Sequence, residues 1–128
     1  MLNMKRLVSS WIFAQKRGVD RPGYETHSWA VDEVINFASD KPDLLWETIL
    51  EILDLDSSEE IIKAVGAGPL EDLMVYHGSQ FIQKVDSQAE KSNVFKTAMQ
   101  NVWLDSDDTS VYSKFYEIAG IEQPLAKK

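Results

Sequence analysis

The chain has 128 residues, 44% of them hydrophobic, so it is long and apolar enough for one domain with a buried core. It contains no cysteine, which excludes disulfide bonds, thiolate zinc sites and cysteine nucleophiles. The formal net charge of −8 disfavours contact with phosphate and therefore predicts no binding to nucleic acid.

Apolar residues recur three and four positions apart through almost the whole chain, which predicts helices and no strands. Gly18 and Pro42 mark the end of one helix and the start of another. Ser57 and Glu60 have the spacing of a capping box, which indicates the start of a short fourth helix. The four tryptophans are expected to brace the packing of the helices. In chain order, the predicted helices cover about residues 4–17, 27–38, 42–53, 58–65, 69–90, 94–103 and 111–119.

The fifth of these helices is predicted to begin at a glycine and a proline. Gly68 suits the N-cap position, and Pro69 suits the first helical position, where a missing N–H has no cost. Glu71 and Asp72 then place negative charge in the first turn, and the Glu71 carboxylate is expected to reach back to the N–H of Gly68. This pattern predicts a well-capped helix over residues 69–90.

Short connections and the lack of a repeat predict an all-α single domain of six or seven helices over residues 1–123, followed by a frayed tail over 124–128. The helices fit either a bundle or a short solenoid-like array of antiparallel pairs. No segment reaches the about 20 apolar residues that cross a bilayer, and the N-terminus lacks the pattern of a signal peptide. We therefore expect a cytoplasmic protein with no membrane contact.

The most specific motif of the chain is Gly-Ala-Gly-Pro-Leu-Glu-Asp-Leu, followed four residues later by His77-Gly78. We call residues 66–78 the signature segment. Together with Trp11-Ile12, Trp46 and Val102-Trp103, it resembles a family of small bacterial all-helical domains of unknown function, which carry A-G-P-L-E-D-L-x3-H-G between tryptophan-bearing helices. The resemblance extends over about residues 7–120. It implies an all-helical fold and assigns no activity.

His77 is the first candidate for chemistry, because it lies on the apolar stripe of the fifth helix. A catalytic histidine needs a carboxylate partner, and Glu71 and Asp72 lie about 120° and 140° away at roughly 100° per helical residue. We therefore interpret His77 as a histidine at the edge of the core that bonds a backbone carbonyl or a side chain, with Gly78 admitting a close neighbouring helix. The alternative is a small hydrolase or ligand-binding domain with a pocket near His77, Glu71 and Trp46.

No metal ion or cofactor is expected. The two histidines, His27 and His77, are fifty residues apart and lack the spacing of a metal site. Asp54 and Asp105 each begin a segment rich in aspartate, but neither segment has the glycine and glutamate that a calcium loop needs at its sixth and twelfth positions. The motifs of a nucleophilic serine, a P-loop and a dinucleotide-binding loop are also missing, so we expect no enzymatic activity.

Negative charge is concentrated in the middle of the chain, where residues 25–72 contain thirteen acids and two lysines, a net charge of −11. Such a segment favours a basic protein partner, because opposite charge speeds association. We therefore expect a non-enzymatic interaction domain, such as an immunity-type or adaptor protein, and leave open a nucleic-acid mimic and a merely solubilising surface. The expected surface consists of exposed acids of the second to fourth helices: Asp32, Glu33, Asp43, Glu47, Glu51, Glu59 and Glu60.

Overall fold

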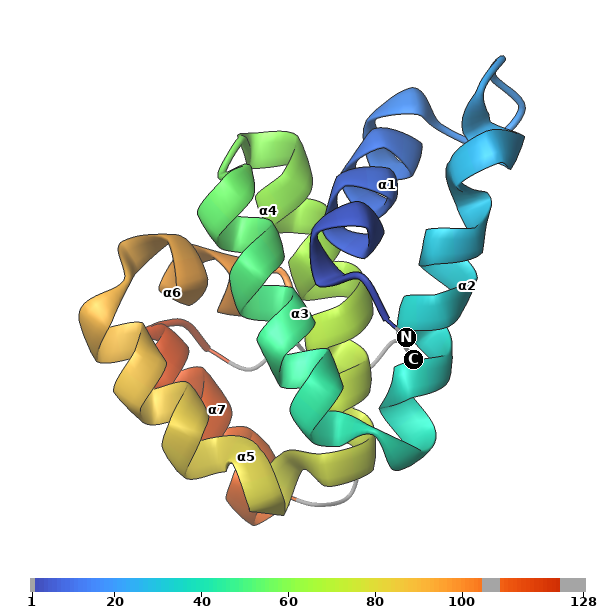
Figure 1. Ribbon diagram of the computed structural model, residues 1–128. Helices are drawn as coiled ribbons and strands as arrows, with labels where there is room; N and C mark the ends of the chain where they lie inside the picture. The colour runs from blue at the N-terminus through green and yellow to red at the C-terminus, as the bar shows by residue number, and fades with distance from the viewer. Residues whose placement is uncertain (1, 105–108, 123–128) are drawn as a thin grey trace, which may run out of the picture.

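The computed structural model describes residues 2–104 and 109–122. Within these ranges it contains seven α-helices, one π-helical turn and no strand (Figure 1). In chain order the elements are α1 (Met4–Arg17), α2 (Tyr24–Asp40), α3 (Pro42–Leu55), α4 (Glu59–Val65), the π-turn (Gly66–Leu70), α5 (Glu71–Lys91), α6 (Asn93–Met99) and α7 (Thr109–Ala119).

The helices form a bundle. Helices α1 and α2 pack together on one side of the molecule, and α5 and α7 pack together on the other (Figure 1). Helix α3 lies between the two pairs and contacts α1, α2, α4 and α5. Helix α1 also contacts α4, so contacts are not restricted to neighbours in the chain as they are in a solenoid. The predicted all-α fold of six or seven helices is confirmed, and the predicted tail, 124–128, lies outside the described residues.

The core is built from the apolar stripes that the periodicity predicted. Leu45, Ile49 and Ile52 of α3 are fully buried. Each such side chain stabilises the fold by about 1.5–3 kcal/mol through the removal of apolar surface from water. The largest aromatic members of the core come from five helices: Trp11 (α1), Phe37 (α2), Phe81 (α5), Phe95 (α6), and Phe115 and Tyr116 (α7).

The predicted start of the fifth helix at Gly68 is wrong. The chain enters the π-turn directly from α4 and leaves it directly into α5, with right-handed helical backbone angles at both junctions. Gly68 is therefore not an N-cap, and Pro69 is buried inside a helical segment. The wide turn accommodates Pro69, whose ring would clash with the preceding turn of a regular α-helix.

A close contact with α6 holds the π-turn. A Cβ atom at Gly66 would lie 2.3 Å from the carbonyl oxygen of Ala98 and 2.7 Å from Cβ of Asn101. No side chain fits in that space, so α6 and the segment that follows it pack directly on the backbone of the π-turn. This contact joins residues far apart in the sequence, and it overrides the local signal for a helix start.

Helix α5 bends at His77, whose backbone angles, φ −140° and ψ 26°, are not helical. The bend divides the helix into a first part that runs behind α3 and a second part that turns towards α6 (Figure 1). Gly78 is buried at the bend, and a Cβ atom there would lie 3.2 Å from Cγ1 of Val111 on α7. The predicted close approach of a neighbouring helix at Gly78 is confirmed.

Two other helix ends differ from the prediction. The N-cap of α4 is Ser58 rather than Ser57, and its hydroxyl oxygen accepts the N–H of Ile61 at 3.4 Å. Helix α6 ends at Met99, so Trp103 follows the helix instead of belonging to it. Both differences are local and leave the order of the helices unchanged.

The two glycines that flank Ala67 provide a matched test of the π-turn. We expect Gly66→Ala to lower the free energy of unfolding by more than about 2 kcal/mol, because the added methyl group overlaps a backbone oxygen. We expect Gly68→Ala to change it by less than about 1 kcal/mol, because no described atom of another element lies within 4 Å of the added Cβ. Urea denaturation measures both, and equal effects at the two positions would contradict the contact with α6.

Candidate functional site

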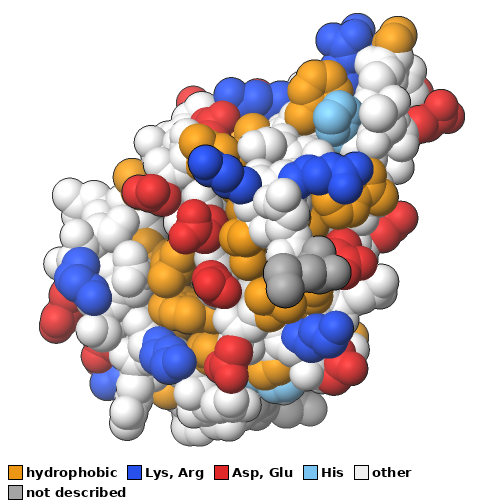
Figure 2. Space-filling model, in the orientation of Figure 1, with side chains coloured by type: hydrophobic (Ala, Val, Ile, Leu, Met, Phe, Trp, Pro, Cys, Tyr) orange, Lys and Arg blue, Asp and Glu red, His pale blue; other side chains and the backbone are white. Residues whose placement is uncertain are grey.

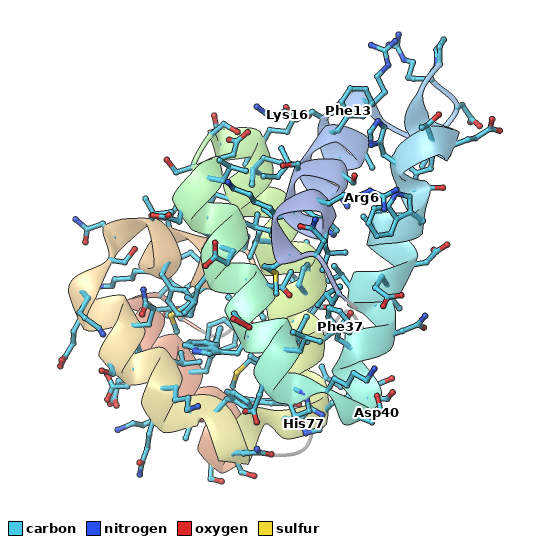
Figure 3. The ribbon with its side chains drawn as sticks, in the orientation of Figure 1. Arg6, Phe13, Lys16, Phe37, Asp40 and His77 are labelled. Carbon is cyan, nitrogen blue, oxygen red and sulfur yellow. The ribbon has the colours of Figure 1, made fainter. Side chains whose placement is uncertain are left out.

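His77 is engaged by the backbone of another helix. Its Nε2–H donates to the carbonyl oxygen of Ala38, in the last turn of α2, at 2.7 Å. Figure 3 shows the side chain of His77 near Asp40, at the end of α2. Carbonyl groups in the last turn of a helix have no hydrogen-bond donor within that helix. His77 supplies such a donor to the carbonyl of Ala38. The interpretation of His77 as a histidine at the edge of the core, bonded to a backbone carbonyl, is confirmed.

The Glu71 carboxylate does not reach back to Gly68 as predicted. Its Oε1 atom accepts the backbone N–H of Trp103 at 3.0 Å, which ties the start of α5 to the segment after α6. Trp103 is itself 47% exposed, so the expectation that all four tryptophans brace the core is wrong for this one. Glu71 therefore anchors a connection between two elements.

Trp46 packs inside an aromatic cluster. Its ring centroid lies 5.9 Å from that of Phe81 and 5.5 Å from that of Phe95. Such ring pairs stabilise a fold beyond the area they bury. Trp46, Glu71 and His77, the residues of the alternative pocket, thus have three separate sets of neighbours, and none of them lines a cavity described below.

Three other residues of the signature segment meet in one cavity. Gly68, Pro69 and Asp72 line a groove of about 270 Å³ between α1, α2 and the π-turn, which we call the Asp72 groove. Among the described residues, Asp72 is the only charged one in its lining. Within the described part of the chain the Asp72 carboxylate has no hydrogen bond or ion pair. Burial raises the pKa of Asp72 above its ordinary value of 3.8.

A row of carboxylates runs along the exposed side of α3. Asp43, Glu47, Glu51 and Asp54, which we call the α3 acidic row, follow one another at intervals of four, four and three residues and so share one helix face. All four are exposed, and none forms an ion pair within the described residues. Figure 2 shows acidic side chains in a line over α3. Asp54 is missing from the predicted surface, although its spacing from Glu51 signals its place in the row.

The other predicted acids are arranged differently. Asp32 and Glu33 lie on α2, and Glu59 and Glu60 lie in the first turn of α4. Glu59 forms an ion pair with Lys63 at 3.4 Å. Figure 2 shows basic side chains between acidic ones on the same face of the molecule. The predicted acids therefore lie on three helices, and only those of α3 form a row.

A second groove, of about 500 Å³, adjoins the α3 acidic row between α3 and α6. Glu51 and Asp54 line it together with Leu50 of α3 and Val94 and Phe95 of α6. A lysine or arginine side chain lays its methylene stem on apolar surface while its charged head meets a carboxylate. This α3–α6 groove offers both kinds of surface.

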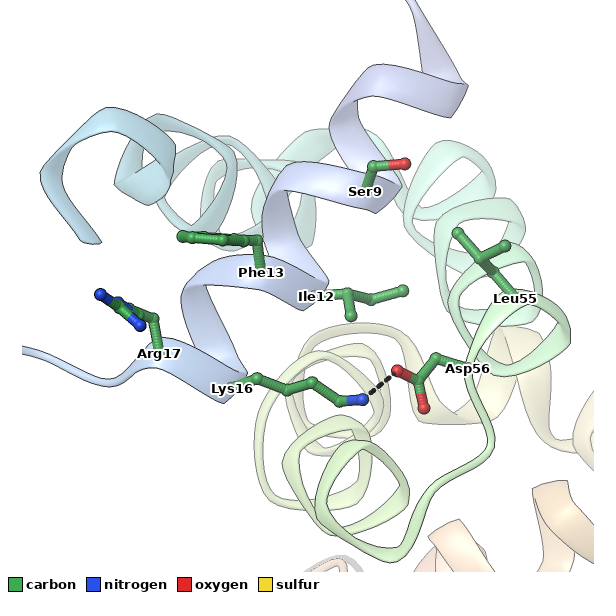
Figure 4. Close-up of a pocket in the computed structure, with 7 residues that line it drawn as sticks. All are labelled: Ser9, Ile12, Phe13, Lys16, Arg17, Leu55 and Asp56. Carbon is green, nitrogen blue, oxygen red and sulfur yellow. Dashed lines mark ion pairs between the residues drawn. The ribbon is translucent and has the colours of Figure 1, made fainter. Parts of the chain in front are cut away.

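A third cavity, of about 460 Å³, lies where α1 meets the end of α3 (Figure 4). Phe13 and Leu55 line it and are 42% and 62% exposed. Lys16 forms an ion pair there with Asp56 at 2.7 Å. The Nε–H of Arg17, which also lines the cavity, donates to a backbone carbonyl of the α1–α2 loop. The charge of Lys16 is thus already neutralised by the protein itself.

The described residues, 2–104 and 109–122, include both histidines of the chain and many carboxylates. Within these residues no three His, Asp or Glu side chains come together in the manner of a metal site. No helix in the ranges 2–104 and 109–122 has the length and apolar character needed to cross a bilayer. The aspartates of the segment that begins at Asp105 lie outside the described residues.

Replacing His77 with alanine leaves the Ala38 carbonyl without its donor. We expect the free energy of unfolding in urea to fall by about 1–3 kcal/mol, the cost of a half-buried polar group that loses its partner. Gln80→Ala is the control, because Gln80 is exposed on the same helix, and it should change stability by less than about 0.5 kcal/mol. Equal stability of His77→Ala and the wild type would contradict the assigned bond.

The ion pair of Asp56 predicts a specific pH dependence. The Lys16 ammonium and the N–H of Ser58 lower the pKa of Asp56 from 3.8 to about 2. Because the pKa is lowered in the folded state, the pair stabilises the fold fully above about pH 4 and loses its effect as the pH falls towards about 2. We expect Asp56→Asn to unfold at lower urea concentration than the wild type near neutral pH. The two midpoints should converge between about pH 4 and pH 2.

Asp54→Asn provides the control for this titration, because Asp54 is exposed and has no ion pair within the described residues. Near neutral pH its unfolding midpoint should not fall below that of the wild type, because the substitution breaks no ion pair and removes a like charge from the helix. If the gap between Asp56→Asn and the wild type persists unchanged at the acid end, the pair does not lower the pKa of Asp56.

A comparison with known proteins places the chain in a family without assigning it an activity. No curated protein and no solved structure matches the chain. The model of a family of unknown function, DUF6869, matches residues 17–120, which include the signature segment and most of the described helices. The chain therefore belongs to this family of unknown function.

Proposed function

We propose that the chain is a non-enzymatic interaction domain that binds a basic protein partner through the α3 acidic row. The observation that carries this proposal is the set of four exposed carboxylates on one helix face, none of which forms an ion pair within the described residues. Like charges at this spacing destabilise a helix by about 0.2–0.5 kcal/mol per pair. The row therefore destabilises the free domain, and a cationic partner would offset that repulsion on binding.

The α3–α6 groove supports the same proposal from packing. Opposite charge raises the association rate, whereas buried apolar contact slows dissociation. Glu51 and Asp54 belong both to the row and to the lining of the groove, beside the apolar Leu50 and Val94. A lysine or arginine of the partner can therefore pair with a carboxylate and bury its stem in one step.

An immunity-type or adaptor protein of the cytoplasm fits this chemistry. Such a protein covers the basic surface of its partner, and the lack of cysteine agrees with a reducing compartment. A variant of the proposal is mimicry of nucleic acid, in which DNA competes with the chain for the same partner. The bond between His77 and Ala38 lends no support to a hydrolytic pocket at that histidine.

Charge reversal on α3 tests the proposal. We expect Glu47→Lys with Glu51→Lys to abolish capture of a basic protein from the host lysate at low salt. The same protein should bind the wild type and be released by high salt, because screening weakens exposed charge pairs. Bound proteins are identified by mass spectrometry, and the association rate of a purified partner should then fall at least about tenfold in the double variant.

The matched control is Glu90→Lys with Glu117→Lys, which changes the net charge equally at exposed positions on α5 and α7. This variant should capture the partner as the wild type does. If both double variants lose the partner equally, net charge rather than the α3 acidic row governs binding. If neither loses it, the row is not the interface.

A further inference from the structure

We propose that the Asp72 groove binds a small organic ammonium ion with an apolar body, whose positive head pairs with the Asp72 carboxylate. The groove lies between α1, α2 and the π-turn, and the proposal does not depend on the α3 acidic row. Its volume of about 270 Å³ lies just below the roughly 300–1,000 Å³ of typical small-molecule sites. The ligand is therefore small.

Gly68 keeps the wall of the groove open. A Cβ atom added there would meet no described atom of another element within 4 Å, in contrast to one added at Gly66. Gly68 is not one of the glycines with positive φ, which are Gly18, Gly23 and Gly120. Glycine in a helical segment costs about 1 kcal/mol relative to alanine. No packing contact with another element requires glycine at this position, so the open wall leaves space for a ligand.

Asp72 supplies the charge that the ligand must match. Its carboxylate lies in a groove whose other lining residues are uncharged, and it has no hydrogen bond or ion pair in the described part of the chain. A partly buried carboxylate without a partner is destabilised in its ionised form, as the raised pKa of Asp72 indicates. A cation placed against it would reverse that cost. Because a bound ligand can offset such a cost, half-buried titratable groups in cavities are candidates for functional sites.

The walls of the groove decide which cation fits. Trp11, Val31 and Ile35 give it apolar surface, and Ile35 is 55% exposed at its edge. A strongly hydrated metal ion needs several oxygen ligands, and here a single carboxylate is available. Gln15, also in the lining, adds an amide group that can orient a polar head. Apolar walls with a few polar groups suit an organic cation.

The π-turn explains why these groups meet. A π-turn is rare inside a helix and often marks a functional site. Here it carries Gly68 and Pro69, and Asp72 follows one turn later on the continuous helix. Gly68, Pro69 and Asp72 therefore line the groove. Two other polar residues of the signature segment, Glu71 and His77, bond to other elements instead.

Titration with 2-phenylethylammonium, followed by two-dimensional ¹H–¹⁵N NMR, tests the proposal on the full chain. We expect saturable shifts of the amides of Gly68 and Asp72 and of the Trp11 indole N–H. The neutral analogue 2-phenylethanol should bind at least about tenfold more weakly, because it cannot form the charge-assisted pair. An ammonium group can come from a small free amine or from a lysine of a partner protein. The methylamide of Nα-acetyl-lysine represents the lysine in the same titration. If it binds more tightly than the amine, the groove takes a partner's lysine, and the assignment to a small ligand is overturned.

Two variants separate binding from folding. Asp72→Asn should weaken binding of the amine at least about tenfold and yet melt no lower than the wild type near neutral pH, because it removes a charge that burial disfavours. Gly68→Ala should also weaken binding, because its methyl group narrows the open wall of the groove, and it should keep the fold, because the methyl group meets no described atom of another element. Asp86→Asn, on the far part of α5, is the control and should bind as the wild type does. The absence of saturable shifts, or equal affinity of Asp72→Asn and the wild type, would overturn the proposal.

Discussion

The close approach of α6 to Gly66 is the constraint on which the rest of the structure depends. The carbonyl oxygen of Ala98 occupies the space that any side chain at Gly66 would need, so the π-turn and α6 are packed backbone to backbone. The π-turn carries the helix from α4 into α5 without a break. The direction of α5 is then set at its bend, where His77 bonds to α2 and Gly78 lets α7 approach. The contact at Gly66 and the contacts at the bend together fix where the side chains of the signature segment lie.

The periodicity of apolar residues predicts the seven helices because burial of one helix face is a local pattern in the sequence. The same reasoning places His77 at the edge of the core, because a histidine within an apolar stripe needs a polar partner nearby. The π-turn escaped prediction because Gly68-Pro69 fits a helix start equally well, and the deciding contact comes from Ala98, thirty residues later. The exposure of Trp103 was not predictable for a related reason, because it depends on the end of α6 at Met99.

The carboxylates of the domain fall into groups that their surroundings distinguish. Asp56 is neutralised by Lys16 and stabilises the junction of α1 with α3 and α4. The Glu71 carboxylate accepts the backbone N–H of Trp103. Asp72 and the α3 acidic row have no such partners within the described residues, and each adjoins a groove with apolar lining. Local features that cost stability without an internal compensation are where function is expected. This contrast supports the two proposed surfaces.

The pKa of Asp72 in the free domain tests most directly the claim that the signature segment builds a groove along an unbroken helix. A helix start at Gly68 would place the positive end of the helix dipole near Asp72 and so oppose the effect of burial on its pKa. Burial beside a continuous helix raises it instead. Titration of the Asp72 carboxyl carbon by ¹³C NMR measures this value. The account predicts a midpoint above 3.8, and a midpoint at or below 3.8 would contradict it.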